Sequence, residues 1–197
     1  AQVGAVNTIV HDDGILTGHN TDVEGFRSAL AGLLGDGARG RRCLVAGAGG
    51  AARAVVAALV ADGASDVWLY NRTVTRAEEL CVAANGWGGT RCTVVARDIL
   101  GEMAASADIV VNATTVGLDP AVKGGPFVVD IVRSHHVVMG LVYGPATTDL
   151  VRQARKRGAA AVDGLEMLLM QAAGSYQLWT GRRPSLDVMR AALASVG

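Results

Sequence analysis

The ten residues Cys43–Ala52, CLVAGAGGAA, constrain the fold more than any other stretch of the chain. An apolar run enters a glycine turn, Gly47-Ala48-Gly49-Gly50, and an alanine-rich helical pattern follows from Ala51. In this context a G-x-G-x-x-G/A match predicts dinucleotide binding, because phosphates would meet free N–H groups and the positive end of a helix dipole. The five residues from Gly47 to Ala51 are therefore candidate cofactor contacts. A glycine-rich βα turn without a ligand is the alternative.

Strand and helix patterns alternate from Arg41 to the end of the chain. We expect strands at 43–47, 66–70, about 92–96, 108–112, 136–141 and 159–162, and helices at 50–62, 73–85, near 98–105, 147–157, about 165–180 and 185–195. Repeated βα units of this length predict an α/β protein with a parallel, doubly wound sheet. The loop at 35–41 is the expected boundary of this nucleotide-binding region.

The segment before the loop has a different pattern. Residues 3–10 have strand-like composition, Asp12-Asp13-Gly14 signals a turn, and Ile15–Gly18 can return as the second strand of a hairpin. An amphipathic helix follows, with Thr21 or Asp22 as its expected cap. The chain opens on apolar residues as though within a domain, and we expect further residues upstream.

Composition excludes several classes of function. The chain has 197 residues, is 50% hydrophobic and has a formal net charge of zero, which gives no basic footprint for nucleic acid or acidic membranes. No apolar run is long enough to span a membrane. Three cysteines without C-x-x-C spacing indicate a reducing cytoplasm rather than disulfides or zinc. Adjacent His135 and His136 would point to opposite faces of a strand, so we expect no metal.

The residues after the second strand of the alternation indicate which dinucleotide binds. An enzyme that uses NAD places an acid there, on the ribose 2′-hydroxyl, but this chain has Asn71-Arg72-Thr73 and, one turn on, Arg76. A guanidinium can hold a 2′-phosphate, whereas a carboxylate repels it. Thr73 can cap the next helix and donate to the phosphate. We therefore predict NADP; the alternative is that both arginines form a solvated helix start.

Several short motifs, in one order, carry a resemblance to a known family. They are Gly4-Ala5-Val6-Asn7-Thr8, Asn20-Thr21-Asp22, Gly47–Arg53, Asn71-Arg72-Thr73 with Arg76, Asn112–Gly117, Val142-Tyr143-Gly144-Pro145, and Gly164–Gln171 followed by Trp179-Thr180-Gly181. Together they span nearly the whole chain and resemble the shikimate/quinate dehydrogenase family, which includes the shikimate 5-dehydrogenases. The resemblance implies an oxidoreductase of chorismate and aromatic amino acid biosynthesis, with reversible, NADP-dependent reduction of 3-dehydroshikimate to shikimate.

The resemblance also implies the roles of particular residues. Asn7, Asp22, Tyr143 and Gln171 would bind the substrate, and Asp22, as the catalytic candidate, would pair with a lysine. The cofactor contacts would be Gly47, Ala48, Gly49, Gly50, Ala51, Asn71, Arg72, Thr73 and Arg76, with Leu141 and Gly164 near the nicotinamide. Thr114 follows a strand at the sheet edge where ligands bind, so it can touch NADP or simply start a turn. The domains would be a remnant of an α/β substrate domain with its connecting helix (1–34), an NADP-binding Rossmann domain (41–164) and C-terminal helices that pack back (165–197).

Each implied role has a structural alternative. Asn7 can serve only the hairpin, Asp22 only the helix cap, Tyr143 the core, and Gln171 a domain interface. One rival function is a non-catalytic NADP-binding module. Another is a folate-linked or aldehyde-reducing dehydrogenase, but Asn7 and Asp22, at the spacing seen in the family, argue against it.

The chain also departs from the family pattern. The family's catalytic lysine and its carboxylate-binding serines lie upstream of the asparagine that matches Asn7, and neither Lys123 nor Lys156 lies in a matching motif. We therefore expect the chain as given to bind NADP(H) but to turn over poorly or not at all. Gly140 stands where an aspartate is usual, Leu118 where a methionine is common, and the loop 118–127 is short. These changes leave open a quinate or paralogous dehydrogenase, and a homodimer is likewise left open.

Overall fold

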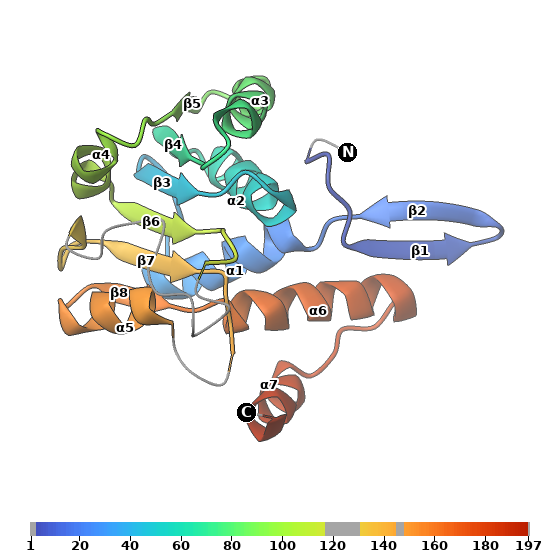
Figure 1. Cartoon of the computed structure of the whole chain (residues 1–197). Coiled ribbons are helices and arrows are strands. Elements are labelled where there is room, and N and C mark those ends of the chain that lie inside the picture. Colours follow the sequence, from blue (N-terminus) through green and yellow to red (C-terminus); the bar gives the residue numbers. More distant parts are fainter. Residues whose placement is uncertain (1–2, 117–130, 145–147, 197) are drawn as a thin grey trace.

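The structure, a computed structural model, describes residues 3–116, 131–144 and 148–196. Its centre is a parallel sheet of six strands in the order β5-β4-β3-β6-β7-β8 (Figure 1). The strands are β3 (Arg42–Ala46), β4 (Asp66–Tyr70), β5 (Arg91–Val94), β6 (Ile109–Asn112), β7 (Val137–Gly140) and β8 (Ala160–Val162). Counted from β3, this is the 3-2-1-4-5-6 order of doubly wound dinucleotide-binding sheets. The predicted α/β fold class is confirmed. Leu118, Lys123, the loop 118–127, Gly117 and Pro145 lie outside the described residues.

Helices cover both faces of the sheet, and β3 shows why. Cys43 and Val45 face one apolar cluster, whereas Leu44 and Ala46 face another, and all four side chains are fully buried. Helices α1, α2, α3 and α6 contribute to the first cluster, and α4 and α5 to the second. The helices are α1 (Asp22–Leu34), α2 (Gly50–Ala61), α3 (Val74–Asn85), α4 (Leu100–Ser106), α5 (Asp149–Lys156), α6 (Leu165–Thr180) and α7 (Leu186–Val196). Because β3 is buried on both faces, its sequence is a continuous apolar run instead of an alternating pattern.

The N-terminal hairpin, β1 (Thr8–Asp12) and β2 (Ile15–His19), extends away from the sheet (Figure 1). Its turn has positive φ at Asp13 (44°) and Gly14 (81°), as a two-residue hairpin turn requires. The predicted hairpin is confirmed, but the first half of the strand expected at 3–10 is wrong. Gly4 has φ of 66°, and the Val3 carbonyl accepts a hydrogen bond from Arg53 Nε on α2 at 2.9 Å. The segment before β1 therefore lies against α2 instead of pairing with a strand.

Two predicted helix caps are only partly correct. Thr21 and Thr73 occupy the N-cap positions of α1 and α3, but neither side chain makes a capping hydrogen bond. At α1 the cap comes from Asn20, whose Oδ1 accepts from the backbone N–H groups of Asp22 (3.1 Å) and Val23 (3.3 Å). The Thr21 hydroxyl is thereby free to bond elsewhere.

Two glycines allow α1 and α6 to pack closely. A Cβ on Gly25 would lie 2.9 Å from the Met167 carbonyl oxygen and 3.1 Å from the Gln171 nitrogen. A Cβ on Gly174 would lie 3.3 Å from Cγ2 of Thr21. Any larger residue at position 25 would push against backbone atoms, so this crossing needs the glycine. The crossing brings the start of α1 beside the middle of α6. In the part of the chain that the structure describes, no helix is long and apolar enough to cross a membrane.

Candidate active site

Three of the four predicted substrate residues meet in one polar cluster. Asn7 lies just before β1, Asp22 is the first residue of α1, and Gln171 lies in the second turn of α6. Asn7 Nδ2 donates to Asp22 Oδ1 at 2.8 Å and lies 3.4 Å from Gln171 Oε1. The cluster thus joins residues up to 164 positions apart in the sequence. The backbone N–H of Asn7 donates to the His19 carbonyl of the hairpin at 3.0 Å. The Asn7 side chain, however, belongs to the polar cluster, so Asn7 does not serve the hairpin alone.

Three hydroxyl groups support the cluster from behind. Asn7 Oδ1 accepts from the Thr21 backbone N–H at 2.9 Å and from the Thr8 hydroxyl at 3.0 Å. The Ser175 hydroxyl lies 2.7 Å from that of Thr8 and 3.2 Å from that of Thr21, and donates to the Gln171 carbonyl at 3.1 Å. Sequence reasoning missed Ser175. Its position four residues after Gln171, hence on the same helix face, was the available signal.

The carboxylate of Asp22 is half-buried, and this changes its acidity. Burial raises the pKa of Asp22 above its ordinary value, and the hydrogen bond from Asn7 offsets only part of that rise. A cation placed beside Asp22 would lower this pKa again and hold the carboxylate ionised. The site is thus built to accept either a positive group or a hydroxyl donor at Asp22.

Tyr143, the fourth predicted substrate residue, is not part of this cluster. It lies beyond the end of β7, its side chain is 46% exposed, and it has no hydrogen bond to another described residue. The alternative that Tyr143 is a core ring is therefore wrong. Its role in substrate binding stays a prediction.

The glycine turn lies at the C-terminal end of β3 and is open to the outside. Gly47 has φ of 117°, its N–H donates to the Tyr70 carbonyl at 2.8 Å, and a Cβ there would lie 2.7 Å from the Ala113 carbonyl oxygen. Gly49 precedes the first residue of α2, and no heavy atom lies within 4 Å of the Cβ position built on it. The turn is thus a cradle that side chains leave clear, at the N-terminus of a twelve-residue helix.

The predicted 2′-phosphate residues stand beside this turn. β4 pairs with β3 in register, Ala46 opposite Tyr70, so the residues that follow the two strands share one edge of the sheet. Arg72 and Arg76 are exposed, and neither has an ion pair or hydrogen bond to a described residue. The first turn of α3 carries no acid, although Glu78 and Glu79 follow. Two unpaired guanidinium groups at a helix N-terminus create a strongly anion-attracting corner.

Further predicted cofactor residues lie along the same C-terminal edge of the sheet. Thr114 follows β6, and its hydroxyl donates to Asn112 Oδ1 at 2.7 Å and accepts from the Val116 N–H at 3.2 Å. The side chain therefore shapes a turn, and contact with NADP stays a prediction. Leu141 and Gly164 are in contact: a Cβ on Gly164 would lie 2.1 Å from the Leu141 carbonyl oxygen. Only glycine fits where α6 begins beside the end of β7.

Glycine at position 140, where an aspartate is usual in the family, offers no hydrogen-bond acceptor to a nearby buried hydroxyl group. A Cβ there would lie 3.7 Å from the hydroxyl oxygen of Thr148, at the start of α5, and 3.5 Å from Val151 Cγ2. That hydroxyl is buried without a hydrogen-bond partner among the described residues. An acceptor side chain at position 140 would satisfy it.

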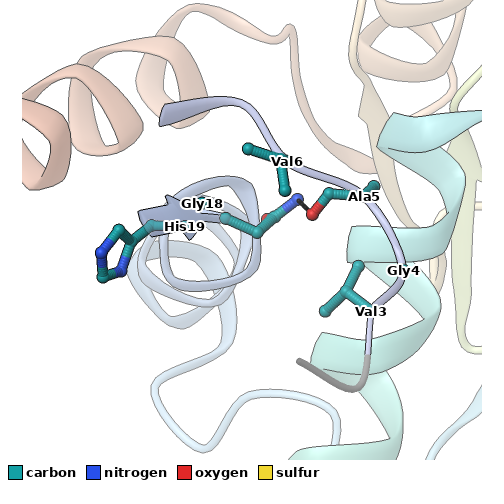
Figure 2. Close-up of a pocket in the computed structure, with 7 residues that line it drawn as sticks. Val3, Gly4, Ala5, Val6, Gly18 and His19 are labelled. Carbon is teal, nitrogen blue, oxygen red and sulfur yellow. Dashed lines mark hydrogen bonds between the residues drawn. The ribbon is translucent and has the colours of Figure 1, made fainter. Parts of the chain in front are cut away.

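A pocket of about 370 Å³ lies between the segment before β1 and the end of β2 (Figure 2). Its lining is Val3, Gly4, Ala5, Val6, Gly18, His19 and Asn20. Within this lining, Asn20 Nδ2 donates to the Ala5 carbonyl at 3.1 Å. Since Asn7, Asp22 and Gln171 do not line it, this pocket is distinct from the polar cluster.

The histidine pair is not placed as predicted. Both residues precede β7, and their rings are in edge-to-face contact, with centroids 4.2 Å apart, instead of pointing to opposite faces of a strand. His136 is buried and His135 exposed, and the described residues contain no group of three or more His, Cys, Asp or Glu side chains arranged to hold a metal. All three cysteines are free and buried. Cys81 and Cys92 lie together, which their spacing in the sequence did not indicate.

The sheet is doubly wound and has an open glycine turn at its C-terminal edge, which defines the Rossmann-fold class of dinucleotide-binding proteins. The polar cluster lies beside this turn. The family model described as shikimate / quinate 5-dehydrogenase matches residues 29–120, and that of the shikimate 5′-dehydrogenase C-terminal domain matches residues 164–194. The shikimate dehydrogenase (NADP(+)) of Moorella thermoacetica is 43% identical over 194 residues, which are 96% of this chain and 64% of the relative.

Two solved structures are similar over almost the whole chain. Quinate dehydrogenase from Corynebacterium glutamicum, in complex with NAD, has a TM-score of 0.91 at 37% identity, covering 98% of this chain and 69% of that one. Shikimate 5-dehydrogenase from Thermus thermophilus, in complex with NADP(H) and shikimate, has a TM-score of 0.81 at 38% identity, covering 97% and 68%. The chain belongs to the shikimate dehydrogenase family of oxidoreductases, and the predicted resemblance is confirmed. It spans 64% of the length of the Moorella relative.

Proposed function

We propose that this protein binds NADP(H) at the glycine turn and contributes to the reversible reduction of 3-dehydroshikimate to shikimate. The observation that carries the proposal is the convergence of Asn7, Asp22 and Gln171 in one hydrogen-bonded cluster. The segment that leads to Asn7 lies on the first turns of α2, where a Cβ on Gly50 would be 3.9 Å from that of Ala5. The polar cluster and the glycine turn are therefore neighbours, as a hydride-transfer site needs.

The residues present fit the cofactor. The clear cradle at Gly49 and the N-terminus of α2 suit a pyrophosphate, and the unpaired Arg72 and Arg76 suit a 2′-phosphate. When bound, NADPH would supply the hydride for the reduction, and NADP⁺ would accept it in the reverse direction. Leu141 and Gly164, at the ends of neighbouring elements, are proposed to border the nicotinamide.

The polar cluster suits a small polyol acid. The amides of Asn7 and Gln171 offer both donors and acceptors, and Asp22 accepts from hydroxyl groups. With a cation beside it, Asp22 stays ionised and holds that cation near the reacting oxygen, where it can stabilise developing negative charge and donate a proton. Tyr143 is proposed as a further substrate contact.

The test separates cofactor choice from catalysis. Purified protein is titrated with NADPH and NADH by fluorescence, and shikimate oxidation by the full-length gene product is followed with NADP⁺ and NAD⁺. Arg72→Ala is expected to weaken NADPH binding about tenfold or more, the cost of one charge-assisted contact, and to leave NADH nearly unchanged. Equal losses for both cofactors would contradict the 2′-phosphate role.

Quinate dehydrogenase is the second candidate function. The Corynebacterium quinate dehydrogenase, solved with NAD, has the higher TM-score of the two structures described above. Comparing quinate with shikimate, each with both cofactors, decides between the two. Turnover of neither substrate, with intact NADPH binding, would favour the non-catalytic module. Free cysteines favour a reducing compartment, so we also propose a cytoplasmic location; a homodimer stays a prediction for light scattering to test.

A further inference from the structure

Two cysteine side chains meet at one edge of the sheet. Cys81 lies on α3 and Cys92 on β5, the outermost strand, and their sulfur atoms are 2.9 Å apart. Both residues are at most 6% exposed. Cys43, the third thiol, is fully buried in β3, and β4 separates that strand from β5.

The position of Cys92 relative to α3 is fixed by Asn85 rather than by the thiols. Asn85 follows Cys81 by one helical turn and lies on the same side of α3. Its Nδ2 donates to the Cys92 carbonyl at 3.1 Å, and its Oδ1 accepts from the Cys92 N–H at 2.8 Å. This pair of hydrogen bonds holds the Cys92 backbone against the end of α3, so the two sulfur atoms face each other before any covalent bond forms.

We propose that Cys81 and Cys92 are a reversible dithiol site, which a peroxide converts to an intrachain disulfide while Cys43 stays reduced. Cys81 attacks the peroxide oxygen and becomes a sulfenic acid, with release of one water. Cys92 then attacks the Cys81 sulfur, the S–O bond breaks, and a second water leaves. Overall, two thiols and one hydrogen peroxide give one disulfide and two waters, and a dithiol reductant reverses the change.

The surroundings support Cys81 as the attacking group. The hydrogen bond from the Cys92 thiol lowers the pKa of Cys81, whereas the same contact and burial raise that of Cys92. Hydrogen peroxide is the oxidant of choice because it is about the size of water and both thiols are at most 6% exposed. The disulfide would close the connection between α3 and β5, which contains Trp87 and three glycines.

The test is oxidation of the intact protein with hydrogen peroxide, followed by non-reducing peptide mapping. The expected result is a monomer that has lost two of its three free thiols, with a crosslinked peptide pair containing Cys81 and Cys92. Closing this short loop should raise the melting temperature by about 5 °C, and reductant should restore the original value. Crosslinks through Cys43, disulfide-linked dimers, or over-oxidation of Cys81 without a crosslink would each overturn the proposal.

Two variants make the test specific. Cys43→Ser should oxidise like the wild type, because it leaves the pair intact. Asn85→Leu removes the hydrogen bonds to the Cys92 backbone but keeps both thiols, and should slow crosslinking about tenfold through loss of alignment. An unchanged rate in Asn85→Leu would refute the pre-alignment. If either variant fails to fold, the wild-type peptide map alone decides whether the disulfide forms.

Discussion

Gly25→Ala is the substitution that most directly tests how the polar cluster is assembled. The added Cβ would lie 2.9 Å from the Met167 carbonyl oxygen, 3.1 Å from the Gln171 nitrogen and 3.2 Å from the Gln171 Cβ. Two of these three atoms belong to the backbone of α6, so they cannot rotate away. The helices must separate by a few tenths of an ångström, which breaks the native packing between α1 and α6.

Gly32→Ala provides a matched control in the same helix. Gly32 is exposed, and no heavy atom lies within 4 Å of its Cβ position. Both substitutions gain about 1 kcal/mol of helix propensity, so the difference between them isolates the packing cost. Overpacking costs about 1–3 kcal/mol. The melting temperature of Gly25→Ala should therefore lie about 2–12 °C below that of Gly32→Ala.

The site gives a second measurement of the same contact. Separation of α6 from α1 would carry Gln171 away from Asn7, whose amide contact is already long at 3.4 Å. Gly25→Ala should then weaken shikimate binding while NADPH affinity, which depends on the glycine turn, stays unchanged. If Gly25→Ala proves as stable as Gly32→Ala, the close crossing of α1 and α6 is not present in solution.

Three further predictions concern single residues. Gly164→Ala places a Cβ 2.1 Å from the Leu141 carbonyl oxygen and should destabilise the protein by about 3 kcal/mol, the upper part of the overpacking range, measured by urea unfolding; an unchanged midpoint would contradict the contact. Gly140→Ser should give the buried Thr148 hydroxyl an acceptor and exceed Gly140→Ala in stability by about 1 kcal/mol; equal values would mean that the hydroxyl is already satisfied. Because burial raises the pKa of Asp22, its carboxyl favours folding below the ordinary value of 3.8 and loses that contribution as pH rises through the folded-state value. Asp22→Asn should therefore raise the melting temperature at neutral pH and have no effect near pH 3; a decrease at neutral pH would reverse the assigned sign.

Much of the sheet could be predicted because its signals are local. These signals are the apolar run of β3, the glycines that follow it and the regular βα spacing, and each involves only a few residues. The observed bounds of the strands and helices agree with the predicted bounds to within about two residues. The start of the chain could not be predicted in this way. The composition of Val3–Asn7 is typical of a strand. The position of this segment, however, depends on Arg53, fifty residues away from Val3, whose guanidinium donates to the Val3 carbonyl.

The polar cluster shows a different limit. Asn7, Asp22 and Gln171 carry no periodic or spacing signal that joins them, and only the family resemblance placed them together. The supporting hydroxyl of Ser175 was missed, because a serine within a helix is unremarkable without the residues it faces. Cys81 and Cys92 were missed for a related reason. Their contact depends on how β5 returns beside α3, which follows from its pairing with β4 and from the hydrogen bonds between Asn85 and Cys92.

The two parts of the candidate site are mechanically connected through α2. Its N-terminus forms the glycine turn, whereas Arg53, one turn later, holds the segment that leads to Asn7. A guanidinium atom of Arg53 would lie 3.3 Å from a Cβ on Gly4, so the segment passes closely over the helix. The crossing of α1 and α6, in which Arg53 takes no part, positions Asp22 and Gln171. Cofactor residues and substrate residues should therefore respond to separate substitutions, while α2 sets the distance between them.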